Sequence, residues 1–378
     1  MSNVIRDIVL ILIATTLRLM KTPAGYSIEQ FDLAALHETQ LGEAARLLQA
    51  QNHERTPEDP LTSIEAITQR IRATTPDQWR ATFGARDASG KLVGSAFVGW
   101  NKNEPENAHA RWSEVNVLPE HRRRGIGTAL LRTAVEACLE QGDDLVFFGQ
   151  SVDRLPAGEA FARAIAATPG LEIKLNQLSI ADVDRAKVAE WASLDPKGYR
   201  LERADNVVPP KLIEPFLDSA NAMNDMPKGD LRFADQKYTE EQLHSRESWL
   251  KQAGMEWWLI VAIHEATGEG AGFTEVNYDP RVGHVVQQSG TGVIAAHRGH
   301  RLGLWMKAVM LDRIMRERPA AKFIRTGNAN VNKNMLEINT LLGFRHAWSN
   351  TLWQLPLAEA RTSLGAPGER HGVEFPHA

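Results

Sequence analysis

The chain has 378 residues, of which 43% are hydrophobic and 24% are charged, so it can bury substantial cores and is expected to form two domains. A net charge of -4 gives no general attraction to nucleic acid, and we expect neither nucleic acid nor a membrane as a partner. The single cysteine, Cys138, excludes an internal disulfide framework and a cysteine-rich metal site, and it fits a reducing, cytoplasmic compartment.

Residues 1–24 are expected to be a leader in front of the folded part. Their apolar run, between Asp7 and Arg18, spans about nine residues, whereas roughly 20 are needed to cross a bilayer. A secretory signal would have a basic start and a small-residue cleavage site, but an acidic residue, Asp7, precedes this run. We interpret the segment as a packed or frayed leader, with membrane association as the alternative.

Two motifs recur along the chain at nearly the same spacing. The turn sequence ASGKLVG at 88–94 returns as ATGEGAG at 266–272, an offset of 178 residues. HRRRGIGTALL, from His121, returns as HRGHRLGLWMK, from His297, an offset of 176 residues. Because two different motifs rarely share one spacing by chance, the sequence indicates a tandem duplication.

Each copy has the same predicted order of elements. Two helices around a loop that contains Pro and Asp come first, then a strand, a turn and a strand, and then a third strand that leads into the arginine motif. A helix and a short apolar strand follow. The strands are expected at 79–85, 92–100, 110–119 and 144–149 in the first copy and at 257–263, 270–278, 285–295 and 322–327 in the second.

This order predicts an α+β fold in which each copy has a mostly antiparallel mixed sheet flanked by helices. We place the first domain at 25–195, the second at 196–357 and a C-terminal tail at 358–378. Pro209 and Pro210, shortly after the boundary, interrupt regular structure.

The arginine motifs are candidate phosphate sites. A strand that passes through a glycine-containing turn into a helix leaves backbone N–H groups unpaired along the helix axis, and such groups bind phosphate. Arginines in this turn oppose the helix dipole at about 0.3–1 kcal/mol each, which charge-assisted bonds to phosphate of about 1.5–3 kcal/mol would offset. A solvated basic helix start is the alternative, and the recurrence of the motif argues against it.

At these residues the chain resembles a known family. VNVLPEHRRRGIGTALL is similar to the acetyl-CoA pyrophosphate loop of the GNAT superfamily of N-acetyltransferases, whose Arg/Gln-x-x-Gly-x-Gly/Ala signature is matched by Arg122, Gly125 and Gly127. NANVNKNMLEINTLLGF resembles the closing motif of the family, which ends in Leu-Gly-Phe. The likeness covers 25–356 as two consecutive domains, the arrangement of bacterial tandem-GNAT proteins, a group that includes mycothiol synthase.

The resemblance implies acetyl-CoA as cosubstrate, no metal, and a small-molecule primary amine as acceptor, which attacks the thioester directly in a ternary complex. The loop amides would hold the pyrophosphate, and the strand before the loop, at 116–118 or 292–294, would pair with the pantetheine. The residues that the resemblance places at the cosubstrate are Val117, Arg122, Arg123, Arg124, Gly125, Gly127, Thr128, Val293, Arg298, Gly299, His300, Arg301, Gly303, Leu304, Asn328 and Asn334.

The second copy departs from the family pattern at two positions. Arg301 replaces the first loop glycine, so we expect a backbone angle there that a side chain tolerates and a charge that substitutes for open backbone. Asn339 replaces the tyrosine that often protonates the leaving thiolate, and Phe161 stands at that place in the first copy. A thiol pKa near 8.5 allows the thiolate to leave without an acid.

The amine also needs to lose a proton, for which the candidates are carboxylates near the predicted strand. Glu114 is the candidate in the first copy, with an exposed structural glutamate as the alternative. In the second copy, Glu275 or His284 would act through water. Trp257 and Trp258 are expected in the core rather than at the substrate.

The acceptor is expected at the loop between the first two helices of each copy. In the second copy Asn224, Asp225 and Asp230 are the candidates for holding the amine, and in the first Glu58 and Asp59 are. Ordinary capping of the loop is the alternative reading.

We expect catalysis in the second copy, with cosubstrate binding in both, because the second copy has the closing motif and the more elaborate acceptor loop. The protein is expected to be a monomer or a homodimer. The alternatives to a small-molecule N-acetyltransferase are a catalytically silent acyl-CoA or amine binding protein and an N-acetyltransferase of proteins.

Overall fold

The computed structural model describes residues 22–32 and 36–364. The expected leader, apart from its last three residues, and most of the expected tail therefore lie outside the described residues. Within the described part, no helix has both the length and the apolar character needed to cross a bilayer.

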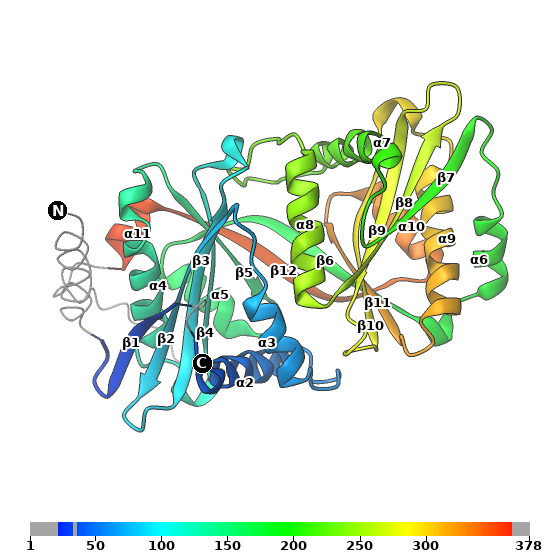
Figure 1. The fold of residues 1–378 in the computed structure, drawn as a ribbon. Helices are drawn as coiled ribbons and strands as arrows, with labels where there is room; N and C mark the ends of the chain where they lie inside the picture. The colour runs from blue at the N-terminus through cyan, green and yellow to red at the C-terminus, as the bar shows by residue number, and fades with distance from the viewer. Residues whose placement is uncertain (1–21, 33–35, 365–378) are drawn as a thin grey trace.

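One continuous sheet runs through both halves of the molecule, in the strand order β1-β2-β3-β4-β5-β12-β6-β11-β10-β9-β8-β7 (Figure 1). The strands expected beside the two turns and around the arginine motifs are all confirmed. The strands are β1 (Tyr26–Phe31), β2 (Gln78–Asp87), β3 (Leu92–Asn101), β4 (Ala110–Val117), β5 (Val146–Val152), β6 (Thr168–Ser179), β7 (Tyr199–Asp205), β8 (Glu256–His264), β9 (Gly270–Tyr278), β10 (Val285–Val293), β11 (Phe323–Ala329) and β12 (Arg345–Pro356).

Helices cover both faces of this sheet, so the expected α+β class is confirmed. The helix that follows each arginine motif packs on one face, α4 over β2 and β3 and α9 over β8 and β9. In the second half, α7 and α8 pack on the other face. The helices are α2 (Glu38–Arg55), α3 (Ile64–Arg72), α4 (Ile126–Glu136), α5 (Pro156–Ala164), α6 (Arg185–Ala192), α7 (Pro210–Asn221), α8 (Glu240–Ala253), α9 (Leu302–Glu317), α10 (Lys333–Leu342) and α11 (Leu357–Ser363).

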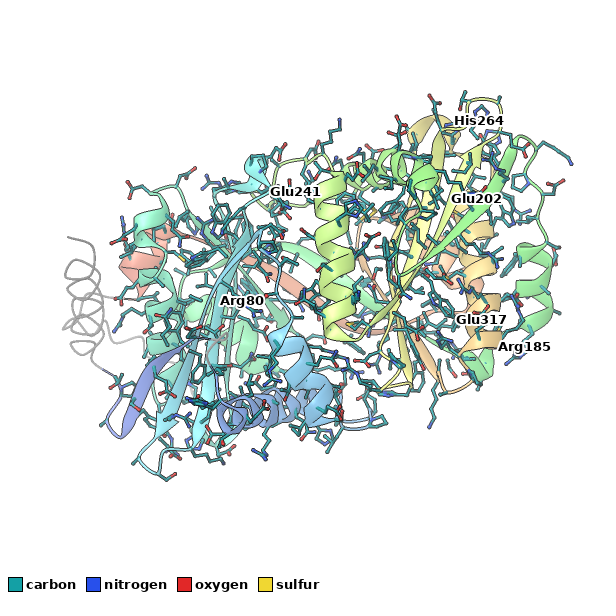
Figure 2. All side chains as sticks on the ribbon, in the orientation of Figure 1. Arg80, Arg185, Glu202, Glu241, His264 and Glu317 are labelled. Carbon is teal, nitrogen blue, oxygen red and sulfur yellow. The ribbon has the colours of Figure 1, made fainter. Side chains whose placement is uncertain are left out.

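Side chains follow this layering. Trp257 and Trp258 are both buried and belong to cores on opposite faces of β8, as alternation along a strand requires, so their expected place in the core is confirmed. Cys138 lies in the core under α4, where burial raises the pKa of its thiol to about 11. Charged side chains such as Arg185 and Glu317 lie on the outside of the second half (Figure 2).

The two halves repeat the same backbone plan. The turns of both hairpins contain a left-handed glycine, Gly90 (φ +84°) and Gly268 (φ +77°). In the first half the parallel ladder between β4 and β5 ends at Trp112 and Phe148. In the second half the ladder between β10 and β11 ends at Gln288 and Thr326. Beyond these pairs the two strands of each half are no longer paired with each other, and the first strand runs on toward the arginine motif.

The halves exchange their last strands. β6 pairs with β11 of the second half, and β12 pairs with β5 of the first half, while β6 and β12 pair with each other at the centre of the sheet (Figure 1). Leu178 of β6 and Val188 of α6 lie in the core of the second half. A cut between residues 195 and 196 would therefore leave each of these strands hydrogen-bonded to the other half.

Candidate active site

The loops that enter α4 and α9 share one backbone path. Each has two left-handed positions in the same frame, Arg123 (φ +60°) and Gly125 (φ +81°) in the first half, and Gly299 (φ +86°) and Arg301 (φ +60°) in the second. A side chain in such a region costs about 1–3 kcal/mol. Each half therefore has one glycine and one strained arginine, in opposite order, and Arg301 keeps the left-handed angle of the glycine that it replaces.

The start of α9 borders a cavity of about 700 Å³, which we call the cosubstrate groove. The groove lies between the end of β10, the helix start and α10. No side chain caps the helix at Arg301, so the N–H groups of residues 302–304 have no intrahelical partner. The predicted cosubstrate residues that line the groove are Val293, Arg298, Gly299, Arg301, Gly303, Leu304 and Asn334.

Arg298 reaches a protein carboxylate at the edge of this groove. Its Nε donates to the Val293 carbonyl at 3.1 Å and its Nη2 to Asp225 Oδ2 at 2.5 Å. Arg122 makes the same pair of contacts in the first half, with the Val117 carbonyl at 2.9 Å and with Glu54 at 2.5 and 2.8 Å. Arg122 thus links Glu54 of α2 to the end of β4, and Arg298 links Asp225 to the end of β10. The sequence had predicted both arginines as phosphate ligands.

The histidine of each arginine motif is held by the first strand of its half. Tyr26 Oη lies 3.2 Å from His121 Nδ1, and Tyr199 Oη lies 3.1 Å from His297 Nδ1. Burial, and then the neighbouring His264, lower the pKa of His297, so its ring is neutral at pH 7.

Arg124 and His300, which occupy equivalent positions of the two motifs, also contact these tyrosines. Arg124 donates to the Tyr26 hydroxyl at 3.0 Å, and the His300 ring packs on Tyr199. Both were predicted at the cosubstrate, and His300 does not line the groove.

β10 contains a bulge in its pairing with β9. The register with β9 shifts between Gln288 and Thr291, which leaves Ser289 and Gly290 opposite Glu275. Gly290 N–H donates to Glu275 Oε1 at 3.1 Å. β4 in the first half pairs with β3 without such a shift.

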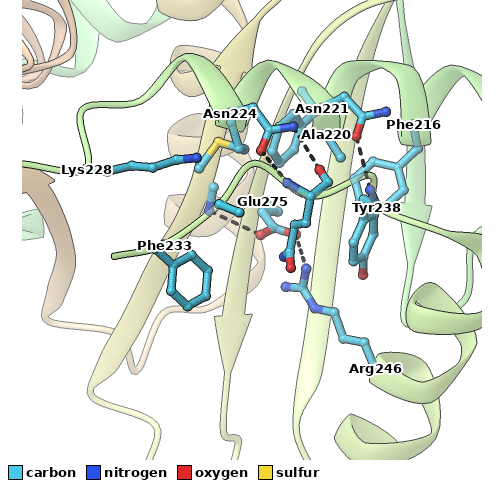
Figure 3. Close-up of a pocket in the computed structure, with 14 residues that line it drawn as sticks. Phe216, Ala220, Asn221, Asn224, Lys228, Phe233, Tyr238, Arg246 and Glu275 are labelled. Carbon is cyan, nitrogen blue, oxygen red and sulfur yellow. Dashed lines mark hydrogen bonds and ion pairs between the residues drawn. The ribbon is translucent and has the colours of Figure 1, made fainter. Parts of the chain in front are cut away.

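A second cavity, of about 350 Å³, lies at this bulge and is called the acceptor pocket (Figure 3). Gly290 and Glu275 line it from the sheet, and α7, α8 and the segment 222–238 enclose the rest. Ala222 lines the cosubstrate groove and its neighbour Met223 lines the acceptor pocket, while Thr291 of β10 lines the groove. The two cavities are therefore lined by neighbouring residues of one short stretch of β10, Gly290 and Thr291.

Glu275 is buried in the wall of the acceptor pocket, with only 5% of its surface exposed. Its carboxylate accepts from Trp257 Nε1 at 2.9 Å. It also pairs with Arg246 Nη1 at 2.8 Å, in addition to its bond with the Gly290 amide (Figure 3). The predicted base is thus fixed by three donors beside the stretch of β10 that lines both cavities.

The predicted acceptor residues of the second copy separate in the structure. Asn224 lines the pocket, but its amide group is hydrogen-bonded to the backbone of Gln236 at 2.8 and 3.2 Å. Asp225 lines the groove, paired with Arg298. Asp230 lines neither cavity, and its backbone bonds to Gly170 and to the side chain of Gln354.

Asn328 and Asn339 lie next to each other behind the groove. Asn339 Nδ2 donates to Asn328 Oδ1 at 2.6 Å, both side chains are buried, and neither residue lines the groove. Asn339 therefore does not take the exposed place expected of a proton donor to the thiolate.

Comparisons with known proteins support the fold. Residues 44–164 match the family described as "Acetyltransferase (GNAT) family". These residues form a GNAT acetyltransferase domain. No curated protein matches the chain in sequence.

Among solved structures, a tandem GNAT protein from the clavulanic acid biosynthesis pathway is 22% identical, with a TM-score of 0.72, over 88% of this chain and 98% of its own. A GCN5-related N-acetyltransferase from Sphaerobacter thermophilus is 12% identical, with a TM-score of 0.63, over 89% of this chain and 97% of its own. Both likenesses show the fold alone, and with the internal repeat they show two consecutive GNAT-like halves.

The first GNAT domain has a cavity of its own, of about 340 Å³, between β4, β5 and α5. Glu114 lines it but is more than half exposed, and its neighbours are Arg55 at 3.8 Å and Asn116 at 2.8 Å. Residues 122–128, the arginine loop, do not line this cavity. The ring of Phe161 lies directly over Gly127.

Glu58 and Asp59, the candidate acceptor residues of the first GNAT domain, also bind arginines. Glu58 pairs with Arg154 at 2.7 Å. Asp59 forms a two-pronged pair with Arg325 of β11 at 2.5 and 2.7 Å, and His284 lies 3.6 Å from it. Desolvation opposes ionisation of Asp59, but the bonds from Arg325 hold the pKa of its carboxyl below the ordinary value.

Most residues of the acceptor pocket were not expected from the sequence, among them Gln236, Tyr238 and Arg246. These three also line a further cavity between the two halves, of about 320 Å³. No motif marks them, because the segment before α8 reaches the pocket only when α7, β9 and β10 are packed together.

The segment 226–238 that covers the acceptor pocket is held by the first half. Asn107 accepts from Ala234 N–H at 2.8 Å and donates to its carbonyl at 3.3 Å. Phe233, which lines the pocket, packs edge-on against Phe148 and beside Trp112. The first GNAT domain thus forms part of the second half's acceptor site.

Proposed function

We propose that the second half transfers an acetyl group from acetyl-CoA to a primary amine of a small molecule, by direct attack in a ternary complex. The observation that carries the proposal is that adjacent residues of β10, Gly290 and Thr291, line the acceptor pocket at the bulge and the groove at the start of α9. In the first half the arginine loop and the cavity are separate, and β4 has no bulge.

The residues of the groove fit the cosubstrate. The uncapped N–H groups of residues 302–304 and the cation of Arg301 would hold a pyrophosphate, since a helix start attracts anions. The edge of β10 at Gly292 and Val293, which β11 leaves open, would pair with the pantetheine amides. When bound, acetyl-CoA would supply a thioester as the acetyl donor.

The reaction forms a bond between the amine nitrogen and the acetyl carbon, breaks the bond between that carbon and sulfur, and releases a CoA thiolate and a proton. The acceptor pocket orients the amine and excludes most water, which converts the encounter into a step within one complex. Glu275 is the carboxylate among the residues that line the pocket, and we propose that it receives the proton of the amine through water.

Release of CoA thiol, measured with acetyl-CoA and a panel of amines, tests the proposal. We expect turnover with at least one class of amine and its loss in Glu275→Gln, with acetyl-CoA binding retained. Saturable binding of acetyl-CoA without turnover on any amine would instead support a silent binding protein.

A further inference from the structure

The acceptor pocket presents a cation to its contents. The charged side chains that line it are Lys228, Arg246 and Glu275. Glu275 is 7% exposed at its side chain and is already bonded to three donors, whereas the side chain of Arg246 is 27% exposed. The guanidinium of Arg246 has five N–H donors. One of its nitrogens, Nη1, is paired with Glu275. The pocket therefore has free capacity to bind an anion and little to bind a second cation.

Arg246 is held in one orientation. Its guanidinium lies over the ring of Trp257, 4.5 Å from the centroid. One of its nitrogens pairs with Glu275 (Figure 3). A planar guanidinium fixed in this way favours a two-pronged contact with a carboxylate. Burial lowers the pKa of Arg246, but Glu275 and Tyr238 more than offset it, so the group stays charged.

Two polar atoms beside Arg246 have unused hydrogen-bonding capacity. Among the described residues, Gln236 Oε1 and Tyr238 Oη are buried and make no well-formed hydrogen bond. Gln236 Oε1 accepts and the Tyr238 hydroxyl can donate, and burial raises the pKa of Tyr238 so that it keeps its proton. Buried polar atoms of this kind usually have a partner, so both atoms are available to a polar ligand in the pocket.

On the side of Arg246 that faces the cavity between the halves, the neighbouring charges disfavour an anion. The cavity between the halves, which shares Arg246 with the acceptor pocket, is also lined by Asp77 and Glu104. On the side of the bulge the lining holds one carboxylate, Glu275, which is already paired with Arg246, and Phe216 and Phe273 form apolar walls.

We propose that the acceptor is a small amine that also carries a carboxylate, an amino acid or an amino acid derivative, with Arg246 binding the carboxylate. The amine group would then lie toward Gly290 and Glu275, beside the stretch of β10 that lines both cavities. This inference rests on the proposed function of the second half.

Matched pairs of amines, with and without the carboxylate, test the inference: L-phenylalanine with phenethylamine, and L-leucine with isoamylamine. We expect kcat/KM for thiol release to be at least tenfold higher for the amino acid of each pair. Arg246→Gln is expected to remove this preference and to leave the KM for acetyl-CoA within twofold. Arg246→Gln alone leaves the Glu275 carboxylate without its partner. The double variant Arg246→Gln/Glu275→Gln is therefore the second variant, and calorimetry measures its binding of L-phenylalanine and of phenethylamine.

Equal kcat/KM for both members of each pair in the unmodified protein would overturn the inference while the proposed function stands. Absence of thiol release with every amine would overturn the proposed function. In that case, calorimetry still decides the inference: tighter binding of L-phenylalanine than of phenethylamine, lost in the double variant, supports it, and equal binding overturns it.

Discussion

Arg298 repeats in the second half the two contacts that Arg122 makes in the first, one to a strand carbonyl and one to a carboxylate. The pairs differ in exposure. Arg122 and Glu54 are 28% and 25% exposed and share two hydrogen bonds, whereas Arg298 and Asp225 are about half exposed and share one.

Alanine at these two arginines is therefore expected to affect stability unequally. Arg122→Ala is expected to lower the free energy of unfolding by about 1–3 kcal/mol, because it strands a partly buried carboxylate. Arg298→Ala is expected to cost less than about 1 kcal/mol, since solvent screens its pair. Urea unfolding of both variants measures the difference, and a larger loss in Arg298→Ala would contradict this account.

Lys307, in the middle of α9, predicts a pH dependence of stability. Its side chain is buried against the Phe344 ring, and burial lowers the pKa of its amine to about 7. Between pH 7 and the ordinary pKa of 10.5 the unfolded chain binds a proton that the folded protein does not bind. Stability from this group therefore rises with pH across that window, by roughly 5 kcal/mol in total.

Lys307→Met removes the free-energy cost of burying this amine. We expect the variant to have a higher Tm than the unmodified protein at pH 7 and the difference to shrink as the pH approaches 10, measured by differential scanning calorimetry. A constant difference at all pH values would show that Lys307 is charged in the folded protein.

The exchange of β6 and β12 predicts that the halves do not fold separately. Residues 1–195 alone would have β5 without its partner β12 and β6 without its partners β11 and β12. Such open edges pair with other chains, so we expect self-association in size-exclusion chromatography. Coexpression with residues 196–378 is expected to restore a one-to-one complex. A monomeric first half with cooperative unfolding would contradict the exchange.

The contact between Asn107 and Ala234 predicts that the first half controls acceptor binding. Asn107→Ala removes two hydrogen bonds that hold the segment 226–238 over the acceptor pocket. We expect the KM for the amine to rise about three- to tenfold, in line with bonds of about 0.5–1.5 kcal/mol, and the KM for acetyl-CoA to stay constant. Asn52→Ala, at an exposed position of α2, is the control. An equal rise in both KM values would contradict a local role.

Much of the fold is predictable from the sequence because the repeated motifs are local. The hairpins around Gly90 and Gly268 and the strands that enter both arginine loops follow from alternating hydrophobicity and turn residues. The edge strands β1 and β7 and the exchanged strands β6 and β12 were not expected. Their pairing joins residues far apart in the chain, such as Val152 and Asn350, which no local pattern encodes.

The candidate site is likewise predictable from the sequence only in part. The groove residues around Gly303 follow from the loop motif and its likeness to a known family. The roles of Arg122 and Arg298 do not, since their carboxylate partners lie 68 and 73 residues away in sequence. Arg246 and Tyr238 become visible only when α8 and the segment before it pack against the bulge of β10.

The central claim, that the second half binds the cosubstrate used in transfer, is tested by reversing one charge in each half. Arg123 and Arg301 are exposed arginines with φ of +60°, one in each loop, so glutamate places equal strain at both. We expect Arg301→Glu to raise the KM for acetyl-CoA at least tenfold, as loss of a charge-assisted bond of about 1.5–3 kcal/mol requires, and Arg123→Glu to leave it within twofold. A tenfold rise in Arg123→Glu with no change in Arg301→Glu would contradict the account.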